Sequence, residues 1–130
     1  MASGSILRLV CHHALGRFYT WDLTVKENQT VISTGPYAII RHPGYVGSLM
    51  IGIGSILMHF GPGSWFRAYG VLDTLGGKIF AAAWGVWSLA IPLMLMKRTS
   101  QEDKVLKESL GEEWEIYARK TPYKFIPYVY

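Results

Sequence analysis

The feature that most constrains this chain is a stretch without formal charge: no Lys, Arg, Asp or Glu lies between Arg41 and Arg67. Within it, residues 44–60 are apolar and rich in glycine, and a second uncharged, apolar run covers 79–96. At about 1.5 Å per residue, each run forms a helix roughly 25–27 Å long, close to the roughly 30 Å hydrocarbon core of a bilayer. The sequence therefore predicts two transmembrane helices, at about 44–60 and 79–96, joined by a loop.

Composition favours membrane helices over the alternative, which is two buried helices of a soluble protein. Of the 130 residues, 50% are hydrophobic and 17% are charged, against about 25% charged in soluble domains. Neither uncharged run has a polar face, and a soluble domain of this size can hardly cover both. The single cysteine, Cys11, excludes an internal disulfide framework and a multi-cysteine zinc site. The length leaves room for one domain, so we expect a single membrane domain over 1–130.

Lysine and arginine are distributed unequally along the chain. Eleven of them lie before the first run or after the second, and two lie in the loop between the runs. Because the cytosolic loops of membrane proteins carry the excess of Lys and Arg, this asymmetry predicts a multi-pass protein with both termini in the cytosol. A membrane surface accounts for the net charge of +4, and we expect no nucleic-acid partner.

The segment before the first run gives a weaker signal. Residues 19–26 alternate between apolar and polar types, which favours a short strand. Glu27-Asn28 is then its turn and 30–32 a return strand, while an interfacial loop is the alternative. We therefore expect a short N-terminal extended or interfacial segment.

The segment after the second run has helical periodicity. Apolar residues recur there at spacings of four, four and three and form one stripe on a charged helix: Leu106, Leu110, Trp114 and Tyr117. Thr121-Pro122 ends this helix. The predicted fold is an all-α membrane protein, with two transmembrane helices in a hairpin and a cytosolic amphipathic C-terminal helix.

A cluster of polar and aromatic residues precedes the first run, in the sequence GPYAIIRHPGYVG at 35–47. Pro43 disfavours helical geometry at His42, so we expect the His42 ring to be exposed where the helix begins. Tyr37 and Tyr45 flank it with aromatic faces. The alternative is an interfacial belt, in which the tyrosines lie among lipid headgroups and Arg41 extends toward water.

A second cluster, KRTSQEDKVL at 97–106, follows the second run. Arg98 and Glu102 are four residues apart, so they share one face of a continuous helix. The alternative is structural: Thr99-x-x-Glu102 and Ser100-x-x-Asp103 both match capping boxes for the C-terminal helix. In that case, Arg98 only contributes to the charge that stops translocation.

A hairpin brings these two clusters to the same membrane face. Together they offer a His, two tyrosines, an Arg and a carboxylate, a set that can hold a cationic, adenine-bearing ligand. Arg98 can bind an anionic group of a lipid-like substrate. The four histidines lack metal-ligand spacing, so we expect no metal site. The chain has no P-loop and no GxGxxG, so a nucleotide-like cofactor would bind in a non-Rossmann manner.

The two clusters resemble the C-terminal half of the protein-S-isoprenylcysteine O-methyltransferase family. The resemblance rests on GPYAIIRHPGYVG and, after the two predicted spans, on RTSQEDKVLKESLGEEWEIYARKTPYKFIPYVY. The order R-H-P-x-Y-x-G, an acidic pair, then G-E-E-W-x-x-Y is specific for a wider group of membrane methyltransferases. The resemblance covers about Leu15 to Tyr130. It implies an enzyme of the endoplasmic reticulum membrane that uses S-adenosyl-L-methionine to methylate the C-terminal carboxylate of prenylated cysteine in proteins.

The resemblance also implies roles for individual residues. Those implied to contact the cofactor lie around the two clusters: Gln29, Thr30, Val31, Ile32, Tyr37, His42, Pro43, Gly44, Tyr45 and Glu102. Arg98 matches the arginine that binds the prenylcysteine carboxylate, and is the implied catalytic residue. The family usually has His at the position of Gln29 and two glutamates at Glu102-Asp103. Because Gln still forms hydrogen bonds, we expect weaker binding of the same cofactor.

Family members also have further transmembrane helices upstream, so we expect this chain to correspond to the C-terminal part of a longer fold. Three other functions fit the same residues. NADPH-dependent membrane sterol reductases share an R-H-P-like motif and a similar ending, although RTSQED matches the methyltransferase pattern better. Phospholipid N-methyltransferases share the cofactor site. A truncated chain that has lost activity and acts only as a membrane fragment is the third alternative.

Overall fold

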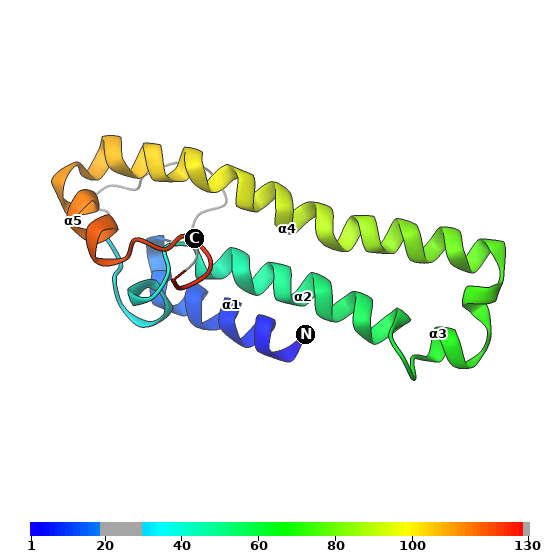
Figure 1. The fold of residues 1–130 in the computed structure, drawn as a ribbon. Helices are drawn as coiled ribbons and strands as arrows, with labels where there is room; N and C mark the ends of the chain where they lie inside the picture. Colours follow the sequence, from blue (N-terminus) through cyan, green and yellow to red (C-terminus); the bar gives the residue numbers. More distant parts are fainter. Residues whose placement is uncertain (19–29, 129–130) are drawn as a thin grey trace.

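The computed structural model describes residues 1–18 and 30–128. These residues form helices and turns and contain no strand. The α-helices, drawn in Figure 1, are α1 (Ala2–Leu15), α2 (Pro43–Phe60), α3 (Trp65–Ala68), α4 (Leu75–Leu110) and α5 (Glu112–Lys120). Short 3-10 helices cover Gly16–Phe18, Gly35–Ala38 and Val71–Asp73. The predicted all-α class is confirmed.

The central unit is the hairpin of α2 and α4, which lie side by side and contain the predicted spans 44–60 and 79–96 (Figure 1). They cross closely at Gly52, where an added Cβ would lie 2.3 Å from the Ser88 carbonyl oxygen. One turn away, the Trp84 indole nitrogen donates to the Ser55 hydroxyl at 3.1 Å. Glycine therefore brings the two backbones together, and one polar side-chain pair is satisfied between them.

Two stretches of the described chain are long and apolar enough to cross a membrane, namely Pro43–Ala68, which continues beyond α2 into α3, and Leu75–Leu110. Their most hydrophobic windows have mean hydropathies of 1.3 and 1.9, yet only 22% and 6% of these windows is buried within the protein. The core helices of a soluble protein would be covered by other elements. Hydrocarbon covers such faces in a bilayer, so the protein is a membrane protein.

The N-terminal helix α1 was not predicted from the sequence. It runs antiparallel to α2: an added Cβ at Gly4 would lie 2.7 Å from the Gly47 carbonyl oxygen, and one at Gly54 would lie 2.5 Å from the backbone nitrogen of Met1. The Arg8 guanidinium also donates to the α2 hydroxyl of Ser48 at 3.0 Å. The start of the chain therefore lies beside the middle of α2, rather than at the end of the hairpin where the C-terminal residues lie (Figure 1).

The predicted strand at 19–26 and its turn at Glu27-Asn28 lie outside the described residues. Residues 30–32, predicted as the return strand, have no regular secondary structure, so that prediction is wrong. Val31 instead donates its backbone N–H to a carboxylate oxygen of Glu113 in α5 at 3.0 Å. The Glu113 side chain, rather than a neighbouring strand, therefore accepts the hydrogen bond of this N–H group.

The predicted C-terminal helix is divided. α4 continues through the charged residues to Leu110, and the chain turns at Gly111, whose φ of 53° is in the region that favours glycine. The apolar stripe predicted for one helix is therefore shared between α4 and α5. α5 ends at Lys120, before Thr121-Pro122, as predicted. Residues 121–126, which we call the C-terminal segment, then return to the start of α2 (Figure 1).

The opposite end of the hairpin, where α2 connects to α4 through α3, is packed with rings. Phe66 stacks on Phe80 with ring centroids 5.7 Å apart, and the Trp84 ring lies 5.8 Å from Phe80. Phe60 meets Phe66 edge-on, and His59 lies 5.4 Å from Trp84. We call these five residues the aromatic cluster.

Candidate functional site

The candidate site lies at the other end of the hairpin, where the start of α2, the charged part of α4 and the C-terminal segment meet. We call it the polar site, and its members are Arg41, His42, Tyr45, Arg98, Glu102, Asp103 and Lys124. The local sequence explains the geometry of its first part. Pro43 is the first residue of α2, and His42 before it has φ −124° and ψ 56°, which confirms the predicted non-helical conformation.

The expectation that the His42 ring is exposed is wrong, because the residue is only 8% exposed. The C-terminal segment covers it. The backbone N–H groups of Arg41 and His42 donate to the carbonyl oxygens of Tyr123 and Lys124, at 2.9 and 3.0 Å. The ring of Phe125, itself buried, lies 6.1 Å from the His42 ring. Two segments about eighty residues apart in sequence are thus joined by backbone hydrogen bonds directly at the site.

Asp103 contacts three basic residues of the polar site. Its Oδ1 lies 2.9 Å from His42 Nε2, while its Oδ2 lies 3.4 Å from Arg41 Nη1 and 3.6 Å from Lys124 Nζ. A carboxylate only accepts hydrogen bonds, so the Nε2 atom of His42 carries the proton in this contact. Sequence reasoning treated Asp103 as part of an acidic pair and a capping box, and it gave Lys124 no role at the site.

Glu102, one residue earlier on α4, contacts the other side of the same ring. The Tyr45 hydroxyl donates to Glu102 Oε1, which also lies 3.4 Å from Arg98 Nε. Glu102 Oε2 is 3.6 Å from His42 Nδ1. The His42 and Tyr45 rings are nearly parallel, with centroids 5.8 Å apart and planes 15° from each other. The structure therefore brings together four residues that the sequence predicted for the site.

The capping-box interpretation of residues 99–103 is wrong. α4 is continuous there, and the buried Thr99 hydroxyl donates to the Met96 carbonyl oxygen at 2.8 Å within the same helix. Ser100 accepts from Lys124 Nζ at 3.5 Å instead of capping a helix start. Arg98 and Glu102 consequently lie on one face of a continuous helix, as the four-residue spacing predicts.

Other predicted residues lie beside the polar site. Tyr37 is in the 3-10 helix Gly35–Ala38, where its carbonyl oxygen accepts from the Tyr117 hydroxyl of α5 at 2.9 Å. Burial raises the pKa of Tyr37 above its ordinary value and raises the pKa of Tyr117 to about 12, so both stay protonated at neutral pH. Pro43 is fully buried and Gly44 is half-buried. Gln29 lies outside the described residues.

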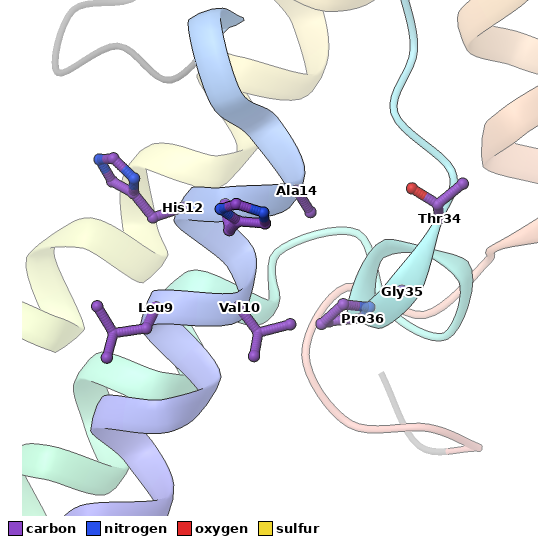
Figure 2. A pocket seen from close by; sticks show the side chains of 8 residues that line it. Leu9, Val10, His12, Ala14, Thr34, Gly35 and Pro36 are labelled. Atoms are coloured by element: carbon purple, nitrogen blue, oxygen red, sulfur yellow. The ribbon is translucent and has the colours of Figure 1, made fainter.

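An open cavity of about 560 Å³ lies between the last two turns of α1 and the 3-10 helix Gly35–Ala38 (Figure 2). Its lining is mostly apolar: Leu9, Val10, His12, His13, Ala14, Thr34, Gly35 and Pro36. None of the charged residues of the polar site contributes to this lining. Among residues 1–18 and 30–128, no group of His, Cys, Asp and Glu is arranged to hold a metal ion.

The residues of the polar site fit an S-adenosyl-L-methionine molecule in chemical terms. Such a cofactor carries a carboxylate, a cationic sulfonium and an aromatic base. The Arg41 Nε atom is a buried donor without a hydrogen-bond partner in the described part of the chain, and it suits the carboxylate. Glu102 is 20% exposed and Tyr45 lies beside it, which suits a cation and an aromatic ring.

The fold and the site together define a helical membrane protein with a charged site at one end of a transmembrane hairpin. The sequence profile of the isoprenylcysteine carboxyl methyltransferase family matches residues 1–76, more than half of the chain. The chain belongs to this family. The matched region contains α1, α2 and the R-H-P motif.

Curated relatives extend the similarity into the second half. A probable protein-S-isoprenylcysteine O-methyltransferase of Oryza sativa is 26% identical over 119 residues, which is 90% of this chain and 52% of the relative. Protein-S-isoprenylcysteine O-methyltransferase B of Arabidopsis thaliana is 27% identical over 128 residues, 97% of this chain and 55% of the relative. A Delta(14)-sterol reductase of Saccharomyces cerevisiae is 27% identical over 109 residues, 84% of this chain and 21% of the relative.

The chain thus spans about half the length of the methyltransferase relatives and about a fifth of the sterol reductase. No solved structure matches this chain. Arg98 and Glu102 lie beyond the part matched by the family profile, so their placement at the polar site comes from the structure.

Proposed function

We propose that this chain carries the methyl-transfer site of a protein-S-isoprenylcysteine O-methyltransferase, which methylates the C-terminal carboxylate of prenylated cysteine with S-adenosyl-L-methionine as donor. The observation that carries the proposal is the pairing of Arg98 with Glu102 beside Tyr45 and His42, at the end of a membrane hairpin. This arrangement offers a cation for an anionic acceptor next to a carboxylate and aromatic rings for a cationic donor. The family and the methyltransferase relatives support it.

The acceptor needs orientation more than activation. A C-terminal carboxylate has a reference pKa near 3.5, so it is ionised at neutral pH without a general base. Arg98, whose side chain is 31% exposed, can bind this anion while its Nε atom faces Glu102. The fork of guanidinium N–H groups can hold two carboxylate oxygens at once and fix the attacking oxygen.

On the donor side, S-adenosyl-L-methionine supplies the electrophilic methyl group. Glu102 and the face of Tyr45 can contact the cationic end of the donor, and the Arg41 Nε atom can donate to its carboxylate. Tyr37 and residues 29–32 and 42–44 complete the proposed cofactor contacts, as the family resemblance implies. His42 is buried, so it would contact the donor only at the edge of the site.

We place the protein in the endoplasmic reticulum membrane, with the polar site on the cytosolic side and prenylated protein C-termini as its partners. The excess of Lys and Arg at the polar end of the hairpin supports this orientation. A glycosylation acceptor introduced near Gly63, in the loop after α2, should then be modified in microsomes. Modification of an acceptor placed after Tyr130, but not of the one near Gly63, would reverse the orientation.

A second candidate is an NADPH-dependent sterol reductase, because a Delta(14)-sterol reductase is 27% identical to this chain over 109 residues. The cofactor separates the two, so we would measure the thermal stability of the detergent-solubilised chain with each one added. A ligand that binds only the native state stabilises it by RT ln(1 + [L]/Kd), or about 2.7 kcal/mol at a hundredfold excess over Kd. We expect S-adenosyl-L-methionine, and not NADPH, to raise the unfolding temperature; stabilisation by NADPH alone would favour the reductase.

A further inference from the structure

Asp103 joins α4 to two segments that are distant from it in sequence. Its carboxylate contacts His42 before α2, Arg41 beside it, and Lys124 in the C-terminal segment. Asp103 is 8% exposed, and a carboxylate this buried is destabilising unless cations and hydrogen-bond donors compensate it. Its removal would leave buried donors and cations without their partner, so the effect should extend to all three segments.

The contact between Asp103 and His42 determines which nitrogen of the His42 ring faces Glu102. Because Asp103 accepts from Nε2 at 2.9 Å, the ring is held with Nδ1 toward Glu102, at 3.6 Å. A hydrogen bond at one imidazole nitrogen fixes the orientation of the ring and therefore which group the other nitrogen faces. The same orientation keeps the ring nearly parallel to Tyr45, whose hydroxyl donates to Glu102.

The contact between Asp103 and Lys124 holds the C-terminal segment, which covers the His42 ring. Lys124 Nζ lies 3.6 Å from Asp103 and 3.5 Å from the Ser100 hydroxyl, so two residues of α4 hold one residue of the C-terminal segment. The backbone of that residue also accepts from the His42 N–H. Phe125 follows directly and packs near the His42 ring.

We propose that Asp103 is a positioning residue: it fixes the orientation of the His42 ring and fastens the C-terminal segment over that ring, and thereby places Glu102 and Tyr45 for the cofactor. This inference deepens the proposed function and rests on it for the identity of the cofactor. The orientation of the ring and the attachment of the segment are claims about the protein alone. The two can therefore be tested separately.

The test uses the full chain in detergent and the variant Asp103→Asn. Asp73→Asn is the matched control, because it makes the same chemical change at an exposed residue at the other end of the hairpin. Three quantities are measured: the ¹⁵N signals of the His42 ring, assigned with His42→Gln; chymotrypsin cleavage at residues 123–125; and the Kd for S-adenosyl-L-methionine. A purely structural defect would not alter the ring signal selectively.

For Asp103→Asn we expect a shifted His42 signal, faster cleavage of the C-terminal segment and a Kd raised at least about tenfold. Asp103→Glu should recover most of the affinity, while Asp73→Asn should change none of the three quantities. An unchanged His42 signal, or a changed signal with unchanged Kd, overturns the inference. If Asp103→Asn does not fold, Lys124→Gln decides: we expect faster cleavage and weaker binding, and no change in either overturns the inference.

If the proposed function is wrong, the same experiment gives a different result. A wild-type chain that does not bind S-adenosyl-L-methionine contradicts the proposed cofactor. The His42 signal and the cleavage rate then still decide whether Asp103 positions the ring and fastens the segment.

Discussion

The two ends of the α2–α4 hairpin are held together by different interactions. At the polar site, Asp103 and Glu102 of α4 bind residues at or just before the start of α2 and after α5, through directional contacts between charged or polar groups. At the other end, Phe66, Phe80 and their neighbours pack as rings from elements that are close in sequence. The polar contacts therefore close long loops of chain, whereas the aromatic cluster only closes a short turn.

This difference is the reason why we assign the proposed chemistry to the polar site. Aromatic packing depends on area and tolerates small changes in geometry, so it stabilises the hairpin without selecting a reactant. Buried charges must be matched in position and sign, and they recognise a ligand by the same rules. The comparison predicts that substitutions at the polar site change binding and activity, and that substitutions in the aromatic cluster change stability.

The largest expected effect is on cofactor binding at the polar site. Glu102→Ala removes the carboxylate that contacts Tyr45 and Arg98. Loss of a charged hydrogen-bond partner costs about 1.5–3 kcal/mol, so we expect the affinity for S-adenosyl-L-methionine to fall roughly ten- to hundredfold. Isothermal calorimetry on the solubilised chain measures this change. Unchanged affinity together with lower helix content would restrict Glu102 to a structural role.

In the aromatic cluster we expect a smaller effect, on the free energy of unfolding rather than on cofactor affinity. Phe80→Ala removes the ring that stacks on Phe66 and lies near Trp84. Each of these two aromatic pairs contributes about 0.5–1.5 kcal/mol beyond its buried area, so the free energy of unfolding should fall by about 1–3 kcal/mol. Thermal unfolding measures the loss, and Phe80→Leu is the matched control that keeps apolar volume. Cofactor affinity should stay unchanged; a tenfold loss would mean that the two ends are coupled.

The smallest effect is expected outside both ends, at the turn from α4 to α5. Lys107 Nζ lies 3.0 Å from Glu115 Oε1, and this contact lowers the pKa of the Glu115 carboxyl below its ordinary value. A lowered pKa in the folded state means that the contact stabilises the fold above the ordinary pKa, and that this contribution is lost as pH falls through the folded value. Both side chains are largely exposed, so the effect is small and is screened by salt.

The variant Glu115→Gln tests this pH dependence. Its unfolding temperature should lie slightly below that of the wild type at pH 7 in low salt, and the difference should disappear at acidic pH. A difference that persists at low pH would mean that packing, rather than charge, explains the effect of the substitution.

The local features of the fold could be predicted from the sequence. Absence of charge over a long run is a local signal, and both predicted spans lie within helices. The non-helical conformation of His42 follows from Pro43, and this prediction was also correct. α1 was missed because its apolar run is short and its contact with α2 depends on Gly4 and Gly47, where the absence of side chains leaves no hydrophobic pattern.

The contacts that complete the site could not be predicted in this way. His42 is buried because the C-terminal segment, about eighty residues later, bonds to its backbone, and no local pattern reports such a contact. The prediction of capping boxes was wrong for a related reason. Thr99 satisfies its hydroxyl within a continuous helix by donating to Met96, so the same residue types fit a helix interior as well as a helix start.

The measurement that tests the central claim most directly is methyl transfer from S-adenosyl-L-methionine to a farnesylcysteine analogue by the wild-type chain and by Arg98→Lys. Lysine keeps the charge but cannot reproduce the two parallel N–H···O bonds of a guanidinium. We therefore expect normal expression and cofactor binding, with transfer lowered at least about tenfold, or roughly 1.4 kcal/mol of transition-state stabilisation. Equal transfer by the two proteins would contradict the assignment of Arg98 as the residue that holds the acceptor carboxylate, and no transfer by the wild-type chain would contradict the proposed function.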